Sequence, residues 1–469
     1  MSVSRHSERE LKKKKILFIV SSDLFVRNYL GTDALDLLVS QFDLTITASS
    51  SVTTIDSLGR WPVYDTFEYP KSIERRHYRL MDLLGWRYRK RSSTFSYRFW
   101  RLFLDVRLQR DWLWPLRVAH RGAQLVHAIL QRIWPVTIWT IDHEMASLPL
   151  GGDLDRIIGE LSPDLVMFPS TAVDPAGTDA IRIARNKGIP SLCLVDNWDN
   201  LSSKTVMWAL PDYACVWGPQ TKEHAITIQG LAADRVFTIG TPRFESYFTL
   251  NDQTAKPSSP YPFRFILFCG CSIPFDEVTS LRLLEDEMQE NQHIYGQAKI
   301  VYRPHPWRQP RLVPDTFDEN EFKHVILDSQ LRSAYKCRQF STNNQPSVDY
   351  YPRLLVNSFF VVGPLTTMLI EALICHREVL AIAYDDKIHK SSPHNALKYY
   401  RHFRGIERLS QLDLARTPSE FTLKFRLQFL RASQKCGETL FNDPMLDHFI
   451  TRAPGTYASR LKCVVDSII

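Results

Sequence analysis

Residues 359–373 read FFVVGPLTTMLIEAL. A short apolar run ends at Gly363, and the hydroxyl residues Thr366 and Thr367 then open a stretch with helical spacing. An apolar run of this length is typical of a parallel strand that is buried on both faces. A buried strand followed by a helix is the repeating unit of an open α/β sheet, so this stretch predicts one such unit.

The same alternation recurs through most of the 469 residues. Strands are expected at residues 16–20, 42–48, 163–168, 190–195, 213–217, 236–239, 263–268, 299–302, 354–356, 359–362 and 379–383. Helices are expected at residues 29–39, 174–186, 275–290 and 367–375. A Pro-Ser-Ser-Pro segment at 257–260 separates the two series. We predict two Rossmann-like, doubly wound α/β domains that face a cleft: residues 1–256 and residues 257–469.

Residues 65–150 break this rhythm with Arg- and aromatic-rich stretches, which predict a helical insertion in the N-terminal domain. Residues 71–132 hold 15 Lys or Arg and 4 Asp or Glu, a local +11 in a chain of net charge +7. Four tryptophans lie in this segment, and Trp134 follows it. Such a surface suits an anionic partner, either lipid head groups or acidic glycan. We expect no nucleic-acid partner, because no helix-turn-helix, zinc-finger or RNA-recognition signature accompanies the charge.

Several other classes of protein are disfavoured. No apolar run reaches the roughly 18 residues of a membrane-spanning helix, and the N-terminus lacks the features of a signal peptide, so we expect a cytoplasmic protein. The eight cysteines lie mostly in apolar runs and predict free thiols. Cys269-Gly-Cys271 lacks zinc spacing, and no Walker A or GxGxxG loop is present. We therefore expect no metal and no tightly bound cofactor.

Residues that can hold a phosphate follow the first two strands of the predicted C-terminal domain. Gly270 and Ser272 come after the first strand, and Arg303 and His305 come after the second, in Tyr-Arg-Pro-His-Pro. Ligands of open sheets bind at such strand ends. Two prolines hold His305 rigidly, where it could bind a phosphate or protonate a leaving nucleotide. The alternative is an ordinary surface-loop histidine.

Thr366 and Thr367 form the next candidate site. Backbone N–H groups and the dipole at a helix start favour a phosphate without a glycine loop. Glu371 lies four residues after Thr367, on the same helical face, where its carboxylate could bind a ribose or sugar hydroxyl. The alternative is plain N-capping by Thr366 and a surface glutamate.

Polar residues also follow two strands of the N-terminal domain. One group follows strand 190–195 and suits a sugar or polar acceptor: Asn197, Trp198, Asn200 and Lys204. Asp174, which follows strand 163–168, or Asp199 could act as the general base. A cluster of Asx turns is the alternative for residues 196–200.

Together these pieces resemble the GT-B glycosyltransferases. Arg-Pro-His305-Pro306 is similar to the His-Pro motif of bacterial sialyltransferases, capsule Kdo transferases and CDP-glycerol glycerophosphotransferases. Thr366-Thr367 before Met-Leu-Ile-Glu371 resembles their phosphate-gripping motif, and residues 196–204 with 240–245 look like surface-polysaccharide transferases. The resemblance covers residues 160–385 and not the insertion.

The resemblance implies a nucleotide-activated donor in the C-terminal domain and a glycan or lipid-linked acceptor in the N-terminal domain, at the inner membrane face. Many such enzymes have a second glutamate eight residues after the first, whereas Glu378 follows Glu371 by seven. This departure favours a CMP- or CDP-linked donor over a UDP-sugar. The alternatives are a non-hydrolysing UDP-GlcNAc 2-epimerase and a non-catalytic glycan- or lipid-binding scaffold.

Overall fold

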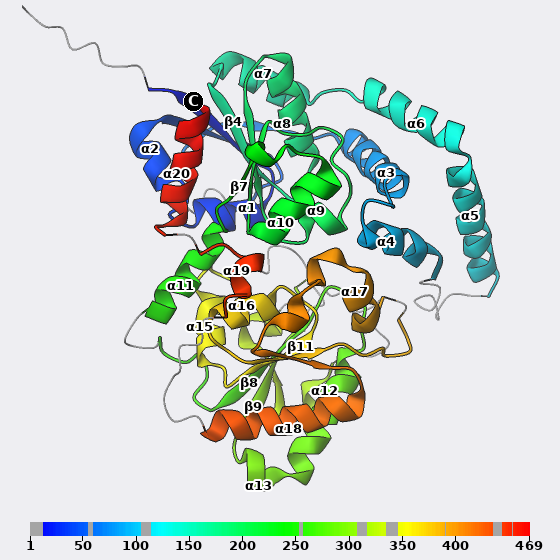
Figure 1. Cartoon of the computed structure of the whole chain (residues 1–469), viewed down its shortest axis with the longest axis vertical. Coiled ribbons are helices and arrows are strands. Elements are labelled where there is room, and N and C mark those ends of the chain that lie inside the picture. Colours follow the sequence, from blue (N-terminus) through cyan, green and yellow to red (C-terminus); the bar gives the residue numbers. More distant parts are fainter. Residues whose placement is uncertain are drawn as a thin grey trace, which may run out of the picture.

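The computed structural model describes residues 13–54, 60–104, 114–252, 257–306, 317–333, 346–389, 391–434, 443–452 and 454–469. Two parallel β-sheets, each covered by helices, lie one above the other (Figure 1). The predicted α/β class with two doubly wound domains and a helical insertion is confirmed.

The N-terminal sheet has the strand order β3-β2-β1-β4-β5-β6-β7, and every pairing in it is parallel. Its strands are β1 (Lys15–Val20), β2 (Asp43–Ser49), β3 (Val63–Phe67), β4 (Leu165–Ser170), β5 (Ser191–Val195), β6 (Tyr213–Val216) and β7 (Val236–Thr238). All residues of β4 and β5 are buried, as expected for strands with helices on both faces. The chain order reverses between β1 and β4, which makes this the switch point of the sheet.

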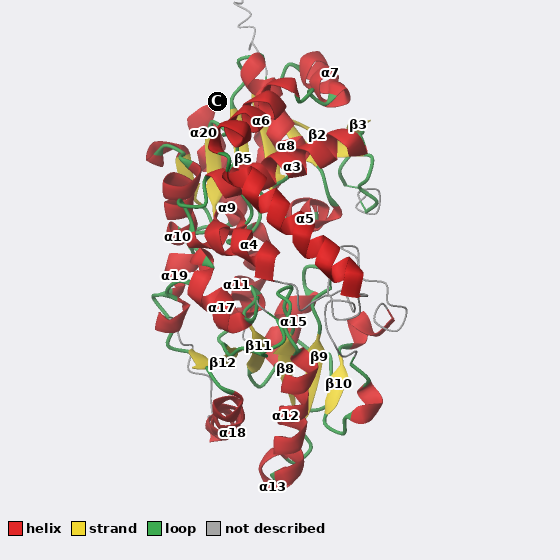
Figure 2. Cartoon of the chain, turned by 90° about the vertical axis from the view of Figure 1, so that its right-hand side faces the viewer, coloured by secondary structure: helices red, strands yellow, loops and turns green. Residues whose placement is uncertain are grey.

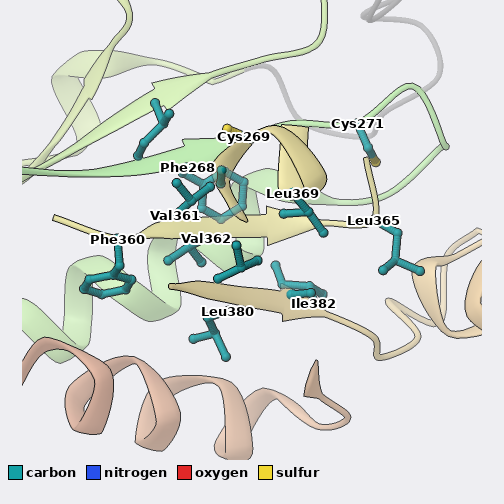
Figure 3. Packing of buried hydrophobic residues seen from close by; sticks show 14 of the residues in the cluster. Phe268, Cys269, Cys271, Phe360, Val361, Val362, Leu365, Leu369, Leu380 and Ile382 are labelled. Carbon is teal, nitrogen blue, oxygen red and sulfur yellow. The ribbon is translucent and has the colours of Figure 1, made fainter. Parts of the chain in front are cut away.

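The C-terminal sheet repeats this arrangement, with the order β10-β9-β8-β11-β12-β13 and a switch point between β8 and β11. Its strands are β8 (Phe265–Cys269), β9 (Lys299–Arg303), β10 (Val325–Leu327), β11 (Val361–Pro364), β12 (Val379–Ile382) and β13 (Leu412–Ala415). Figure 3 shows the apolar side chains that fill this sheet, with Phe268, Val362 and Leu380 from three neighbouring strands.

Helices cover both faces of each sheet. In the N-terminal domain these are α1 (Asp23–Phe25), η1 (Val26–Leu30), α2 (Asp36–Gln41), α7 (Gly152–Leu161), α8 (Pro175–Asn186), α9 (Asn200–Ser203), α10 (Pro219–His224) and α11 (Glu245–Asp252). In the C-terminal half they are α12 (Glu277–Glu290), α13 (Gln292–Tyr295), α15 (Tyr350–Asn357), α16 (Met368–Ile374), α17 (Pro393–Tyr399), α18 (Pro418–Gln434), α19 (Leu446–Phe449) and α20 (Tyr457–Ile468).

The last helix crosses back to the N-terminal domain. Tyr457, Leu461 and Val465 of α20 join the core cluster that contains Phe18 of β1, and α20 packs beside α2 (Figure 1). The range 257–469 therefore supplies a helix to the N-terminal domain as well as the whole second sheet. This crossing ties the two domains together at a second point of the chain.

The helical insertion consists of α3 (Lys71–Arg87), α4 (Ser93–Leu104), α5 (Trp114–Arg132) and α6 (Trp134–Ser147), and it forms an arc beside the N-terminal domain (Figures 1 and 2). Its start differs from the prediction, since residues 63–67 form strand β3. Helix α4 contacts the C-terminal domain: Ser93 Oγ donates to Tyr399 O at 2.8 Å, and Tyr97 stacks on Tyr399 with 4.8 Å between ring centroids.

Other local predictions were wrong. Residues 354–356 lie in helix α15, because a three-residue apolar run does not distinguish a strand from one face of a helix. The helix expected at 29–39 is split into η1 and α2 around Gly31. Strands β10 and β13 were missed, since each is only three or four residues long.

Gly363 in β11 allows a close approach of two neighbouring strands. Its φ is +152°, and a Cβ at this position would lie 2.2 Å from the carbonyl oxygen of Cys269 in β8. No side chain fits there without moving one of the strands.

We expect Gly363→Ala to lower the free energy of unfolding by about 3 kcal/mol or more, measured by chemical denaturation. Gly152→Ala is the control, because Gly152 has open space around its Cβ position. Equal stability of the two variants would contradict the steric argument.

Candidate functional site

The carboxyl ends of the two sheets face one another across the domain junction. Trp198, which follows β5, packs against Phe403 of the C-terminal domain, and Arg243, which follows β7, pairs with Glu371 after β11. Open α/β sheets bind ligands outside the carboxyl ends of strands, at the switch point. The candidate site therefore lies between the loops that follow β1 and β4 and those that follow β8, β9 and β11.

Asp174 is the N-cap of α8, directly after β4 at the N-terminal switch point. Its carboxylate accepts from Ala176 N at 3.2 Å and from Ser21 Oγ, which follows β1. Burial raises the pKa of Asp174 to about 6, although these hydrogen bonds act in the opposite direction. A carboxylate with this pKa is ionised at neutral pH and still basic enough to accept a proton.

Asp199 has a different environment. Burial raises its pKa, but Lys204, His402 and the hydroxyl of Ser203 favour the ionised form, and the net pKa lies below the ordinary value of 3.8. Lys204 Nζ lies 3.6 Å from Asp199 Oδ2. Asp199 is therefore the weaker base of the two predicted candidates.

The remaining residues of the 197–204 cluster bond mainly to one another. Asn200 Oδ1 accepts from Asn197 N at 2.7 Å, and Asn197 Oδ1 accepts from Trp198 N at 2.9 Å. Neither bond closes an Asx turn, in which the side chain accepts from the N–H group two residues further on, so the alternative of an Asx-turn cluster also stays a prediction. Acceptor contacts by Asn197, Asn200 and Lys204 stay a prediction.

Trp198 has a role other than the predicted acceptor contact. Its side chain is 1% exposed and packs edge-on against His402, Phe403 and Phe449, with 5.4–5.7 Å between ring centroids. It cannot stack on a sugar without opening the core that joins the two domains. The sequence predicted an exposed Trp198 because its neighbours along the chain are polar. The residues that bury it, such as Phe403 and Phe449, come from the C-terminal part of the chain.

Arg303 is likewise buried instead of facing a ligand. Its guanidinium pairs with Asp328 and donates to Tyr351 Oη at 2.8 Å, and its side chain is 3% exposed. Burial opposes its charge, but Tyr351 and Asp328 raise its pKa above the ordinary value. The predicted donor contact of Arg303 is replaced by a network that holds the chain just before His305.

Gly270 brings the ends of β8 and β9 together. Gly270 N donates to Arg303 O at 2.8 Å, and a Cβ on Gly270 would lie 3.0 Å from His305 N. His305 is half-buried and Ser272 is exposed. The structure thus places Gly270, Ser272 and His305 at one edge of the sheet, with Gly270 acting through close packing.

Thr366 and Thr367 lie at the start of α16, next to this edge. Thr367 occupies the N-cap position without capping the helix through its side chain, so the predicted alternative of capping by Thr366 is wrong. Both side chains are half-buried, and neither hydroxyl bonds to a described residue. They can therefore donate to a ligand.

Glu371 is bound by the opposite domain. Arg243 Nη2 donates to Glu371 Oε1 at 3.2 Å, and Tyr247 Oη donates to Glu371 Oε2 at 2.5 Å. Both carboxylate oxygens are thus used. The predicted direct contact of Glu371 with a donor hydroxyl would have to use a second lone pair of one of these buried oxygens, and it stays a prediction.

Asp196 is a residue that the sequence did not single out. It directly follows β5 and is buried, and its Oδ1 accepts from Asn28 Nδ2 at 2.9 Å. Burial raises its pKa, while Arg243, Asn28 and Arg27 lower it. The position of Asp196 after a strand was visible in the sequence. Its two neighbouring arginines were not, because Arg27 lies 169 positions before it and Arg243 lies 47 positions after it.

A cavity of about 1180 Å³ lies between the domains on the side of α1 and α11. The polar and charged side chains that line it include Asp23, Arg27, Glu245, Ser246, Asp349 and Arg353. Arg27 Nε also donates to Pro346 O at 2.8 Å, which joins the two walls. The predicted site residues lie outside its described lining.

Within the described ranges, no group of three or more His, Cys, Asp and Glu is arranged to hold a metal ion. The described part of the chain also holds no helix that is long and apolar enough to cross a membrane.

Comparison with known proteins identifies the fold. A UDP-N-acetylglucosamine 2-epimerase structure from Listeria monocytogenes matches with a TM-score of 0.51 at 12% identity, over 97% of this chain and 96% of that one. A UDP-GlcNAc 2-epimerase from Methanocaldococcus jannaschii, in complex with UDP-GlcNAc and UDP, matches with a TM-score of 0.47 at 10% identity, over 97% and 99%. The lipopolysaccharide outer core galactosyltransferase WaaB matches with 0.45 at 11% identity, over 97% and 100%. No protein-family model and no curated protein sequence matches the chain.

The chain therefore has the GT-B fold. At these identities the likeness shows the fold alone, and the resemblance to the His-Pro-motif group stays a prediction.

The raised pKa of Asp174 has a consequence for stability. A carboxyl with a folded-state pKa of about 6 and an unfolded value near 3.8 binds its proton more tightly in the folded state, so its ionisation destabilises the protein as pH rises between these values. Asn caps a helix as well as Asp does and stays neutral. Relative to wild type, Asp174→Asn should gain about 1–2 kcal/mol between pH 4 and pH 7, measured by chemical denaturation at several pH values.

Asp199→Asn is the matched control with the opposite sign. Because the pKa of Asp199 is lowered, ionisation stabilises the fold above pH 3.8, so this variant should be less stable than wild type at pH 7. Parallel pH profiles of the two variants would contradict the assignment.

Proposed function

We propose that this protein is a glycosyltransferase that moves a sugar, or a glycerol phosphate, from a nucleotide-activated donor to a cell-surface glycan or a lipid-linked acceptor. One observation carries the proposal: Asp174, with a pKa of about 6, lies at the N-terminal switch point, while the hydroxyls of Thr366 and Thr367 lie at the C-terminal one. A base and a phosphate site thus belong to opposite domains of a GT-B fold.

The reaction divides between these two groups. The hydroxyls and His305 hold the phosphate of a CMP- or CDP-linked donor and stabilise its charge as the bond to the transferred group breaks. Asp174 accepts the proton of the attacking acceptor hydroxyl. Ser21 orients Asp174 and holds its pKa below the value that burial alone would give. No tightly bound metal is needed, because the helix dipole, His305 and the two threonine hydroxyls already offset the charge of the phosphate.

A second candidate function is a nucleotide-sugar epimerase, because the structure with a TM-score of 0.51 is described as a UDP-N-acetylglucosamine 2-epimerase. An epimerase also fits the two acids Asp174 and Asp196, which follow the neighbouring strands β4 and β5, since proton removal and return need acid–base groups. An epimerase needs neither an acceptor nor contact with a membrane. The basic insertion suits binding to an anionic membrane or a lipid-linked acceptor, so it favours the transferase.

The insertion supports an acceptor at an anionic membrane, where the enzyme would bind peripherally at the inner face. Trp114, Val118, Leu125 and Ile129 recur at intervals of four and seven residues, so they form one stripe along α5. All four are exposed, and Trp139 of α6 continues the exposed apolar surface. Residues 112–141 contain no Asp or Glu. An amphipathic helix of this composition is typical of binding in the head-group region of a bilayer.

Donor chemistry is tested by product analysis with CMP-, CDP- and UDP-linked donors, with and without a lipid-linked acceptor. We expect transfer to the acceptor, and a loss of about 10²-fold or more in turnover for His305→Ala and for Thr366→Ala combined with Thr367→Ala, at unchanged melting temperature. The control is Thr422→Ala in α18, because the half-buried hydroxyl of Thr422 bonds only within its own helix, to Ser419 O at 3.1 Å.

Three results would contradict this assignment. Conversion of a nucleotide sugar without acceptor would make the protein an epimerase. Nucleotide binding with no turnover would make it a scaffold. Normal turnover in both site variants would remove the donor site from these residues.

Membrane binding is tested by vesicle co-sedimentation. We expect wild type to bind vesicles with anionic lipid, more weakly at high salt, and Leu125→Glu with Ile129→Glu to reduce binding by about tenfold or more because charges replace the inserted side chains. The matched control, Leu423→Glu with Leu427→Glu, changes an equally spaced exposed pair on α18. If the α5 variant instead turned a wild-type dimer into monomers, a second copy of the chain would cover this face.

A further inference from the structure

Arg243 is a buried cation where the two domains meet. It lies in η6 (Pro242–Phe244), after β7 of the N-terminal domain, and its partner Glu371 lies in α16 of the C-terminal domain. The two side chains are 12% and 6% exposed. The Nε–H of Arg243 is buried and has no acceptor among the described residues. Since buried donors are nearly always paired, this N–H group lacks an acceptor that the described residues do not supply.

The guanidinium is held in a fixed orientation. Its central carbon lies 4.8 Å from the ring centroids of both Trp217 and Phe244. Tyr247 binds the second oxygen of Glu371 and so fixes the carboxylate that holds Arg243. An arginine fixed by rings and a carboxylate presents its remaining N–H groups as a rigid fork, which matches the oxygens of a phosphate.

Arg243 also lies close to the proposed phosphate site. Glu371 follows Thr367 by four residues, about 6 Å along a helix. Arg243 therefore pairs with a residue of the first turn of α16, the helix that Thr366 and Thr367 precede. A purely structural ion pair would explain the contact with Glu371 but not the donor that is left without an acceptor.

We propose that Arg243 is a ligand of the donor's phosphate groups and that Glu371 and Tyr247 are its positioning residues. This inference rests on the proposed function and assigns to the N-terminal domain a part of donor binding. The donor is then held by hydroxyls of one domain and a cation of the other, so its phosphate binds tightly only when both domains are in place. Glu371 holds the cation instead of a donor hydroxyl.

The experiment measures binding, by calorimetry on the full chain, of inorganic pyrophosphate, CDP and UDP. Arg243→Gln should weaken pyrophosphate binding by about tenfold or more, and Arg243→Lys by about fivefold, because lysine keeps the charge but not the fork. Glu371→Gln should weaken pyrophosphate binding by about threefold, less than either Arg243 variant, because the single amide oxygen can accept from Arg243 or from Tyr247 but not from both. Arg282→Gln is the control, because Arg282 pairs with Glu321 on the surface of α12.

The outcomes separate this inference from the proposed function. If wild type binds CDP or UDP and both Arg243 variants bind pyrophosphate as wild type does, Arg243 serves only in the ion pair that joins the two domains, and the inference is overturned. If wild type binds neither nucleotide nor pyrophosphate, the proposed function and the inference both fail. Should Arg243→Gln fail to fold, the lysine variant, which can keep the pair with Glu371, decides the question. Weaker pyrophosphate binding in Glu371→Gln than in Arg243→Lys would reverse the roles of the two residues.

Discussion

The arrangement of the molecule depends on the aromatic core that joins its two domains. Trp198 packs against Phe403 and Phe449, and Tyr97 of the insertion stacks on Tyr399, within a cluster that continues into the C-terminal sheet. A buried interface of this kind restricts the relative motion of domains far more than a polar one does. It holds the carboxyl ends of the two sheets opposite each other, and the candidate site exists only in that arrangement.

The same junction gives three acids different properties. Asp174 has few charged neighbours, so burial controls its pKa and raises it to about 6. Asp199 lies near Lys204 and His402, and its pKa is lowered. Asp196 has two arginines nearby, yet burial still keeps its pKa above the ordinary value. Position in the fold, rather than residue type, therefore makes Asp174 a stronger candidate for the proposed base than Asp199.

The sequence predicted the fold well, because buried parallel strands are short apolar runs that periodicity reveals, as at residues 16–20 and 359–362. It also predicted that Asp174, His305 and Thr366–Thr367 follow strands, because strand ends can be read from the chain, while their roles at a site stay predictions. It could not predict that Trp198 and Arg303 are buried, since their neighbours Phe403 and Asp328 are distant in the sequence. The pairing of Arg243 with Glu371 was hidden for the same reason: one residue comes from each domain.

The insertion joins two parts of the proposed function. Its helix α4 bonds to the C-terminal domain, where Thr94 Oγ1 accepts from Arg401 N at 2.7 Å and Arg404 donates to Ser93 Oγ at 3.1 Å. The next helix, α5, carries the exposed apolar stripe. Helix α5 packs on α4, which contacts α9 of one domain and α17 of the other. A lipid surface that bound α5 would therefore orient both domains and not the N-terminal domain alone. An acceptor in that surface would then meet a base and a donor site whose relative position the aromatic core has set.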